Sequence, residues 1–236
     1  MTRFKKARDK GCAYLLEKQH DDGSFGSPDL GVTDYYKVPL AFQVCGQTRA
    51  ANRLCDWIRR SGIMPNGDFG PRPKEAINDY FYSYYNSWVV IGAHRLGQFD
   101  LSLMGMEFLM NFWDPENGGF YSSPTERNAE TMEDLWVVSG CAQAALYTGR
   151  IDVARGVARW MELLMALQPN YPQQFYPVYS RAQGLQTVSD GNDFRYVLNQ
   201  DATRDESFYH PGIAGGFLAR LYQATGEQEW LVLAKE

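Results

Sequence analysis

Acidic residues or a histidine stand beside aromatic residues at four places where helical sequence patterns begin. The groups are Asp34 with Tyr35, Asp79 with Tyr80 and Tyr84, Glu133 and Asp134 with Trp136, and Tyr209 with His210. Carboxylic acids and imidazole transfer protons, and aromatic faces bind apolar, cationic or sugar ligands. If the four helix starts face one opening, their side chains form one acidic and aromatic pocket, and we expect a ligand site there.

Residue type divides this set into two roles. The catalytic candidates are Asp134, His210, Glu133 and Asp79, with a buried carboxylic acid or the histidine as the proton donor. The substrate-binding candidates are Asp34, Tyr35, Tyr80, Tyr84, Trp136 and Tyr209. A structural role is the alternative at each place, because carboxylates stabilise helix starts and a histidine there can be a cap. We expect no metal and no cofactor.

Apolar residues at helical spacing predict a first helix at 4–18 and then four helical hairpins. A short turn with glycine, which is typical of helix ends, joins the two helices of each hairpin. The hairpins are 34–47 with 49–60, 79–96 with 101–112, 131–148 with 152–167, and 207–225 with 228–236, joined at Gly46, Gly97, Gly149 and Gly226.

The first helix of each hairpin is apolar on most faces, whereas the second is amphipathic. We therefore expect an inner ring of buried helices inside an outer ring, an all-α, α/α-toroid fold that forms one domain over 1–236. The connections from outer to inner helices are long, and the longest is 168–206. Loops of this length are commonly lids or binding loops, so we expect the pocket to open beneath it.

Composition limits the partners. The net charge is −5 and the pI is near 5.3, which argues against nucleic acid. No apolar stretch reaches the roughly 20 residues of a membrane span, and no apolar run follows the basic start of the chain. The four cysteines lie in helical patterns without metal or redox spacing, which indicates free thiols. We expect a cytoplasmic enzyme with a small-molecule substrate, no nucleic-acid partner and no membrane span.

One segment recurs along the chain. In 10–26 a helical pattern ends at Gln19, and a Gly-Ser-Phe turn follows at Phe25. Weaker copies of this turn contain Phe69, which lies 44 residues after Phe25, and Phe120, which lies 51 residues after Phe69. A period near 50 residues indicates an array of equivalent supersecondary units. We expect the three rings to be buried at equivalent places, each at the end of an outer helix.

The 10–26 segment is very similar to the QW repeat of squalene-hopene and oxidosqualene cyclases, with Phe25 where that family usually has Trp. With its paired helices, the chain resembles the terpenoid cyclase and protein prenyltransferase α/α-toroid superfamily. The resemblance implies a central aromatic cavity for an apolar substrate such as an isoprenoid, and acid-assisted cyclisation or isomerisation. The Asp-x-Asp-Asp segment of the cyclases and the zinc-binding Asp-x-Cys of the prenyltransferases are absent from the sequence, which counts against those two activities.

Two other hypotheses stay open. The turn at 225–227, Thr-Gly-Glu, is similar to hairpin ends in the α/α barrels of epimerases and glycosidases, so a carbohydrate-active enzyme is the second hypothesis. A non-catalytic toroid that serves binding or assembly is the third. Closed toroids of the resembling superfamily have about six hairpins, and four are predicted here. We therefore expect either a missing C-terminal segment or a homo-oligomer that completes the toroid.

Overall fold

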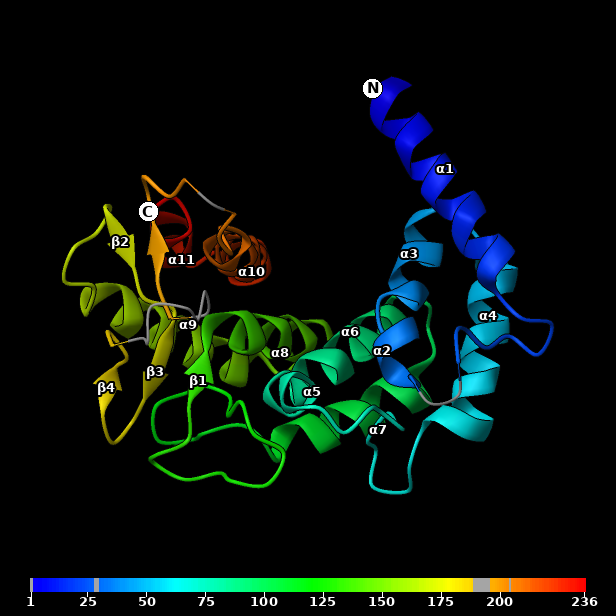
Figure 1. Ribbon diagram of the computed structural model, residues 1–236, viewed down its shortest axis with the longest axis horizontal. Coiled ribbons are helices and arrows are strands. Elements are labelled where there is room, and N and C mark those ends of the chain that lie inside the picture. Colours follow the sequence, from blue (N-terminus) through cyan, green and yellow to red (C-terminus); the bar gives the residue numbers. More distant parts are fainter. Residues whose placement is uncertain (1, 28–29, 189–195, 204) are drawn as a thin grey trace. The chain divides into compact units, whose positions relative to one another are not determined.

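Helices dominate the computed structural model, which describes residues 2–27, 30–188, 196–203 and 205–236 (Figure 1). The chain divides into two compact units, Met1–Asn111 and Phe112–Glu236. Each unit has its own packed helices and is described by itself. The single-domain organisation expected from the sequence stays a prediction.

The first unit consists of helices and one π-helical turn. In chain order these are α1 (Thr2–Lys18), α2 (Val32–Tyr35), α3 (Val38–Val44), α4 (Thr48–Trp57), the π-helical turn η1 (Ile58–Gly62), α5 (Ala76–Tyr80), α6 (Tyr82–Arg95) and α7 (Phe99–Met110). Within this unit α3 packs against α6, and each of them also packs against the helix that follows it, α4 and α7 respectively.

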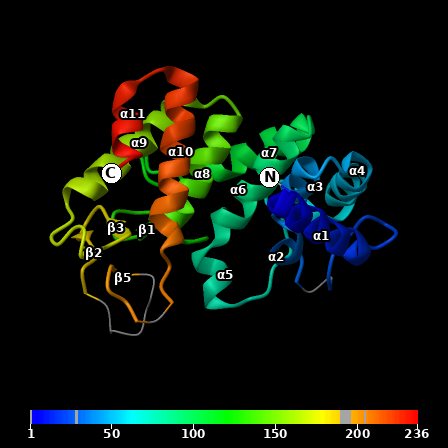
Figure 2. The same cartoon turned by 90° about the horizontal axis from the view of Figure 1, so that it is seen from above.

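The second unit combines helices with short strands. These are β1 (Glu133–Asp134), α8 (Leu135–Tyr147), α9 (Ile151–Ala166), β2 (Gln174–Phe175), β3 (Val178–Ser180), β4 (Gly184–Leu185), β5 (Leu198–Asn199), α10 (Tyr209–Thr225) and α11 (Gln228–Leu233). Here α8 packs against α10, α8 against α9, and α10 against α11, which places these helices side by side in Figures 1 and 2. The strands form two small antiparallel sheets, β1-β3-β4 and β2-β5.

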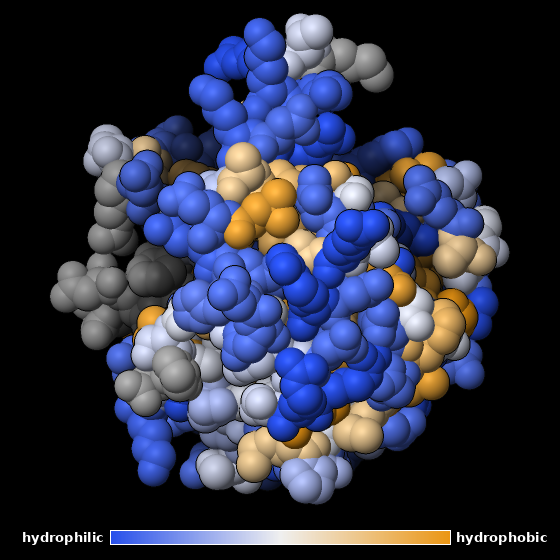
Figure 3. Space-filling model, turned by 90° about the vertical axis from the view of Figure 1, so that its right-hand side faces the viewer, coloured by the Kyte–Doolittle hydropathy of each residue, from blue (hydrophilic) through white to orange (hydrophobic). Residues whose placement is uncertain are grey.

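The described residues thus contain α1 and four helical hairpins, and in each unit the first helices of successive hairpins pack against each other. Those first helices carry the core: ten of the thirteen residues of α8 are buried. By contrast, Cys12 is the buried residue of α1, and the face of this helix turned to the viewer at the top of Figure 3 is mostly hydrophilic. No described helix is long and apolar enough to cross a membrane.

Two expected helices are interrupted in the first unit. The segment 34–47 divides into α2 and α3, with Pro39 in the first turn of α3. Proline lacks an N–H and disfavours helical geometry in the residue before it, so it fits at a helix start and not inside a helix. The segment 79–96 divides into α5 and α6 at Phe81, whose backbone leaves helical geometry (φ −96°, ψ 22°).

The start of the third hairpin also differs from the expectation. Glu133 and Asp134 do not open a helix; they form strand β1, which pairs with Tyr179 and Val178 of β3. The helix begins only at Leu135. The partner strand comes from within 168–206, so the segment expected to be a loop supplies sheet structure; residues 189–195 and 204 lie outside the described residues.

The repeated turn is closed in a similar way at all three places, and the third copy is one residue longer. An isolated antiparallel bridge closes each turn, between Gln19 and Phe25, Ile63 and Phe69, and Trp113 and Phe120. The three phenylalanine rings are buried, as expected. In each turn the Oδ1 of an Asp or Asn accepts a hydrogen bond from the backbone N–H two residues later. Ser24 donates to Asp22, Asp68 to Asn66, and Gly119 to Asn117. The repeat is therefore a structural brace at the end of a helix.

Candidate functional site

Asp134 is the N-cap of α8. Its backbone is extended (φ −97°, ψ 131°), and its Oδ1 accepts a hydrogen bond from the backbone N of Trp136 at 2.7 Å. Its own N–H donates to Ser122 Oγ at 3.3 Å, and the side chain is buried. A capping carboxylate satisfies a free N–H in the first helical turn. Asp134 thus has the capping contact that the sequence offered as an alternative, and its catalytic role stays a prediction.

Glu133 is fully buried against a turn and an outer helix. Its Oε2 accepts hydrogen bonds from Asn117 Nδ2 at 2.8 Å and from the indole Nε1 of Trp160, on α9, at 2.6 Å. Its Oε1 has no hydrogen-bond partner among the described residues. Burial raises the pKa of this carboxyl group to about 7, against the opposing effect of the two hydrogen bonds.

The two neighbouring carboxyl groups do not converge. Successive side chains of a strand point to opposite faces, and the partners follow this rule. Glu133 contacts Asn117 and Trp160, whereas Asp134 caps the helix that follows it. The two carboxyl groups thus have different hydrogen-bond partners, and their joint catalytic role stays a prediction.

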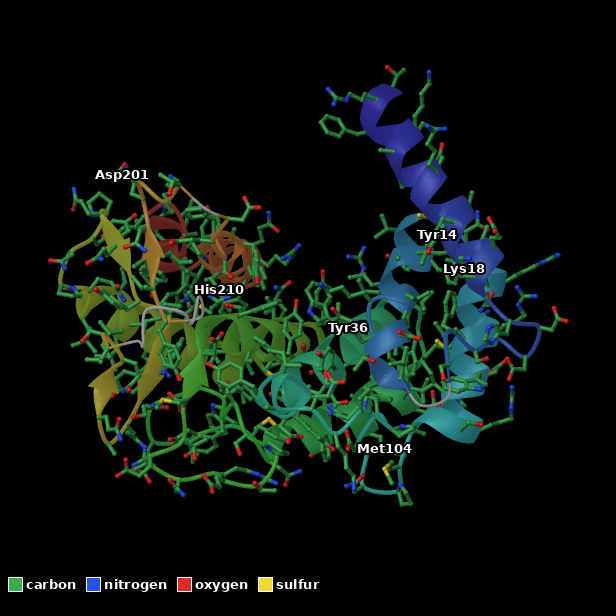
Figure 4. The ribbon with its side chains drawn as sticks, viewed as in Figure 1. Tyr14, Lys18, Tyr36, Met104, Asp201 and His210 are labelled. Carbon is green, nitrogen blue, oxygen red and sulfur yellow. The ribbon has the colours of Figure 1, made fainter. Side chains whose placement is uncertain are left out.

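The imidazole of His210 is buried without a hydrogen bond to any described residue. The side chain is 0% exposed, and neither ring nitrogen has a hydrogen-bond partner among the described residues. Burial lowers its pKa to about 4, so the imidazole is neutral at pH 7. It is the second residue of α10, where Figure 4 labels it, and its backbone N–H donates to the carbonyl of Ser207.

Two aromatic rings border this histidine. The ring centroids of Trp136 and Tyr209 lie 5.3 and 5.0 Å from that of His210, and 4.7 Å from each other in a T-shaped arrangement. Trp136 is half-buried and Tyr209 is 44% exposed, so this three-ring group reaches the surface of its unit. The structure therefore brings together three of the residues expected at the site, one from α8 and two from α10.

The remaining expected residues belong to the first unit and have different surroundings. Tyr35 is fully buried, with its ring T-shaped against Trp57 at 5.4 Å. Asp34 lies half-buried beside Gly26, where a Cβ on the glycine would collide with its carboxylate. Asp79 is exposed on α5. These two carboxylates and the Tyr35 ring do not form one group.

Tyr80 and Tyr84 belong to an aromatic cluster that the sequence reasoning did not identify. The ring centroid of Tyr84 lies 6.1 Å from that of Tyr36 and 6.0 Å from that of Trp88. The ring of Phe81 contacts both the Tyr80 ring and the Tyr84 ring. Lys37 lies over these rings, with its Nζ 5.2 Å from the centroid of Tyr36. The spacing of Tyr84 and Trp88, four residues apart on one face of α6, was the available signal.

A separate apolar cavity of about 360 Å³ lies inside the second unit. Leu135, Met161, Phe175, Phe208, Leu218 and Leu233 are among its lining residues. His210, Trp136 and the two carboxylates of β1 are not part of its lining. Among the described residues, no three His, Cys, Asp or Glu side chains are grouped as a metal site requires.

Searches against protein-family models and against curated proteins gave no match. Solved structures do match. A D-mannose isomerase is similar over the whole of this chain and 69% of its own, with a TM-score of 0.70 and 14% identity. An inactive variant of the α-1,6-mannanase GH76A of Salegentibacter sp. HEL1_6, in complex with α-1,6-mannotetrose, is similar over 92% of this chain and 63% of its own (TM-score 0.59, 16% identity). A sugar epimerase from a ruminal bacterium is similar over 86% and 56% (TM-score 0.53, 10% identity).

The chain has an α/α-toroid fold. At these identities the similarity shows the fold alone, and this chain spans 56–69% of the length of the three proteins. The expectation of a terpenoid-cyclase-like enzyme is wrong, because these neighbours are carbohydrate-active proteins. The turn that carried the resemblance braces the end of a helix, and such a brace is compatible with any chemistry in the toroid.

Proposed function

We propose that this protein is a carbohydrate isomerase or epimerase in which His210 transfers a proton to and from a sugar carbon. The observation that carries the proposal is the His210 group: a neutral imidazole, with both nitrogens free of partners among the described residues, packed beside the rings of Trp136 and Tyr209. Enzymes named for mannose isomerisation and sugar epimerisation are among the structural neighbours, which supports a sugar as the substrate.

The chemistry requires a base that is unprotonated in the free enzyme. In an aldose–ketose isomerisation, the base takes the proton from C2 while the carbonyl oxygen O1 takes a proton from water, which gives an enediol. The base then returns its proton, or one exchanged with water, to C1 while the O2 hydroxyl loses its proton to water and becomes the ketone carbonyl. In an epimerisation, water instead protonates C2 from the opposite face while the O1 hydroxyl loses its proton, and the imidazolium releases its proton to water. Burial keeps the imidazole of His210 neutral, so its nitrogen lone pair is available. Negative charge that develops on the sugar oxygen then favours the imidazolium form.

Aromatic side chains provide the binding surface for the sugar ring. Tyr209 and Trp136 present partly exposed faces next to the imidazole, and apolar C–H faces of sugars stack on such rings. Glycoside hydrolysis is less well supported, since it requires two carboxyl groups on either side of the scissile bond. Glu133 and Asp134 point to different partners and do not supply that pair.

The test is proton exchange at C2. The protein is incubated in D₂O with D-mannose, D-glucose or D-fructose, and ¹H NMR follows loss of the C2 or C1 proton signal and the appearance of the product sugar. We expect His210→Gln to reduce the rate about 100-fold or more, the usual contribution of a general base, with little change in Tm. His20→Gln is the control, because His20 is exposed just after the end of α1 and its Nδ1 is hydrogen-bonded to Ser24. Absence of exchange with every sugar, or an unchanged rate in His210→Gln, overturns the proposal.

A further inference from the structure

Lys37 of the first unit is held over three aromatic rings. Its Nζ lies 5.2 Å from the ring centroid of Tyr36, 5.6 Å from that of Tyr84 and 5.2 Å from that of Trp88. Tyr36 is labelled in Figure 4, at the end of α2, and the other two rings come from one face of α6. The ammonium group therefore has a fixed position over an aromatic surface formed by two segments.

The charge of Lys37 is not neutralised within the described residues. Arg59, Arg72, Arg155 and Arg181 each form a salt bridge to a carboxylate, whereas none of the described carboxylates forms one with Lys37. The Lys37 ammonium donates a hydrogen bond to the hydroxyl oxygen of Tyr36, whereas the aromatic faces attract the cation without accepting its remaining N–H groups as strongly as a carboxylate would. The Nε1 of Trp88 is also buried without an acceptor among the described residues. Donors and positive charge thus gather here without a matching anion.

The rings offer a second kind of contact. Tyr36 and Trp88 are half-buried, so parts of their faces are accessible, and Lys37 itself is exposed. Tyr85 packs edge-on against Tyr36 at 4.9 Å and fixes the orientation of that ring. Apolar faces of a sugar ring stack on such aromatic surfaces, while an ammonium group pairs with phosphate or carboxylate.

We propose that Lys37 with Tyr36, Tyr84 and Trp88 forms a binding site for an anionic monosaccharide, a sugar phosphate or a uronate. The sugar part of this inference rests on the proposed function, and the anionic part rests on the geometry of Lys37. The site lies wholly within the first unit and uses none of the residues assigned to proton transfer. Its ligand stacks on the aromatic rings and places its anionic group on the Lys37 ammonium.

The test is isothermal titration calorimetry of the whole chain with four ligands. D-mannose 6-phosphate and D-mannuronate separate the two anion types, D-mannose is the neutral sugar, and inorganic phosphate is the anion alone. A charge-assisted hydrogen bond contributes about 1.5–3 kcal/mol, so we expect one of the anionic sugars to bind about 10- to 100-fold more tightly than D-mannose. This preference weakens as NaCl is raised, because salt screens an exposed charge.

Lys37→Met removes the charge but keeps most of the apolar stem, and we expect it to abolish the preference for the anionic sugar. Lys18→Met is the matched control, because Lys18 lies 5.5 Å over the single ring of Tyr14; both residues are labelled in Figure 4. Circular dichroism melting confirms that both variants fold. Equal binding of neutral and anionic sugars, an unchanged preference in Lys37→Met, or phosphate that binds as tightly as the sugar phosphate overturns the inference.

The outcomes for the two proposals are distinguishable. Anionic sugars that bind through Lys37 without any proton exchange overturn the proposed isomerase and leave this site in place. Proton exchange on neutral sugars that depends on His210, without any preference for anions, overturns this site and leaves the isomerase in place. His210→Gln is expected to retain the Lys37-dependent binding, because the two groups share no residues.

Discussion

Two buried titratable residues of the second unit oppose each other in their effect on stability. Glu133 has a pKa of about 7 in the folded protein, above the value of 4.5 of an exposed glutamate, so the folded state binds more protons between these pH values. Its contribution to stability is therefore present below pH 4.5 and is lost as pH rises through about 7. His210 has a pKa of about 4, below the ordinary 6.5, and its contribution is lost as pH falls through that interval.

We predict that the two single variants separate these opposing effects. Between about pH 4.5 and 6.5 the two slopes have opposite sign and largely cancel, each being up to about 1.4 kcal/mol per pH unit. Glutamine does not ionise, so the Glu133→Gln variant does not lose stability as pH rises. Its free energy of unfolding should exceed that of the wild type by roughly 3 kcal/mol at pH 8 and equal it near pH 4. Urea denaturation followed by circular dichroism at pH 4, 6 and 8 measures both values.

His210→Gln serves as the comparison for this prediction. This variant keeps the ionisation of Glu133, so its free energy of unfolding should fall steadily from pH 4.5 to 7. The Glu133→Gln variant keeps only the titration of His210, so its free energy of unfolding should rise from about pH 4 to 6.5. A variant Glu133→Gln that is destabilised equally at all three pH values would mean that the carboxylate is required in its charged form to hold Asn117 and Trp160.

At the scale of elements, glycine spacing was the most informative part of the sequence. The four glycines expected to join the hairpins do so, and the glycine of each repeated turn abuts a helix backbone. A Cβ on Gly23, Gly67 or Gly118 would come within 3.0 Å of the carbonyl oxygen of Arg53, Met104 or Gly156, respectively. The repeat therefore marks the places where a turn meets the second helix of the next hairpin.

We predict that Gly118→Ala is far more destabilising than Gly149→Ala. Both glycines have a left-handed backbone, with φ of +94° and +81°, so both alanines incur about 1–2 kcal/mol from backbone strain. Gly149 has open space around it, whereas a Cβ on Gly118 collides with the backbone of Gly156, which cannot move without shifting α9. Thermal unfolding should show a Tm for Gly118→Ala well below that of Gly149→Ala. Equal Tm values would show that the turn does not pack as described.

Helix interruptions and the β1 strand could not be predicted from the same periodicity. Apolar residues continue on both sides of Pro39 and Phe81, so the hydrophobic pattern does not reveal the two breaks. Glu133 and Asp134 were placed in a helix because their strand partner, β3, lies more than forty residues away in the chain. Long-range pairing of this kind has no local signal.

At the scale of the whole molecule, the sequence predicted architecture well and chemistry poorly, and a physical reason underlies the difference. Helical hairpins leave a repeated pattern over many residues, whereas a site depends on a few side chains whose convergence is set by packing. Trp136, Tyr209 and His210 come together, but Glu133 and Asp134 do not, although all five looked equivalent in the sequence. The turn that suggested a terpenoid cyclase belongs to the fold and not to the site.

Burial also predicts how stability varies along the chain, which hydrogen exchange measured by mass spectrometry can test. Amides of α8 should exchange only through unfolding of their unit, because ten of the thirteen residues of that helix are buried. Amides of α1 should exchange orders of magnitude faster, since Cys12 is its buried residue and its packing is against α3. The amphipathic α9, whose inner face is buried and outer face exposed, is the internal reference. Protection of α1 equal to that of α8 at low protein concentration would contradict the packing described here; protection that appears only at high concentration would identify α1 as a surface for self-association.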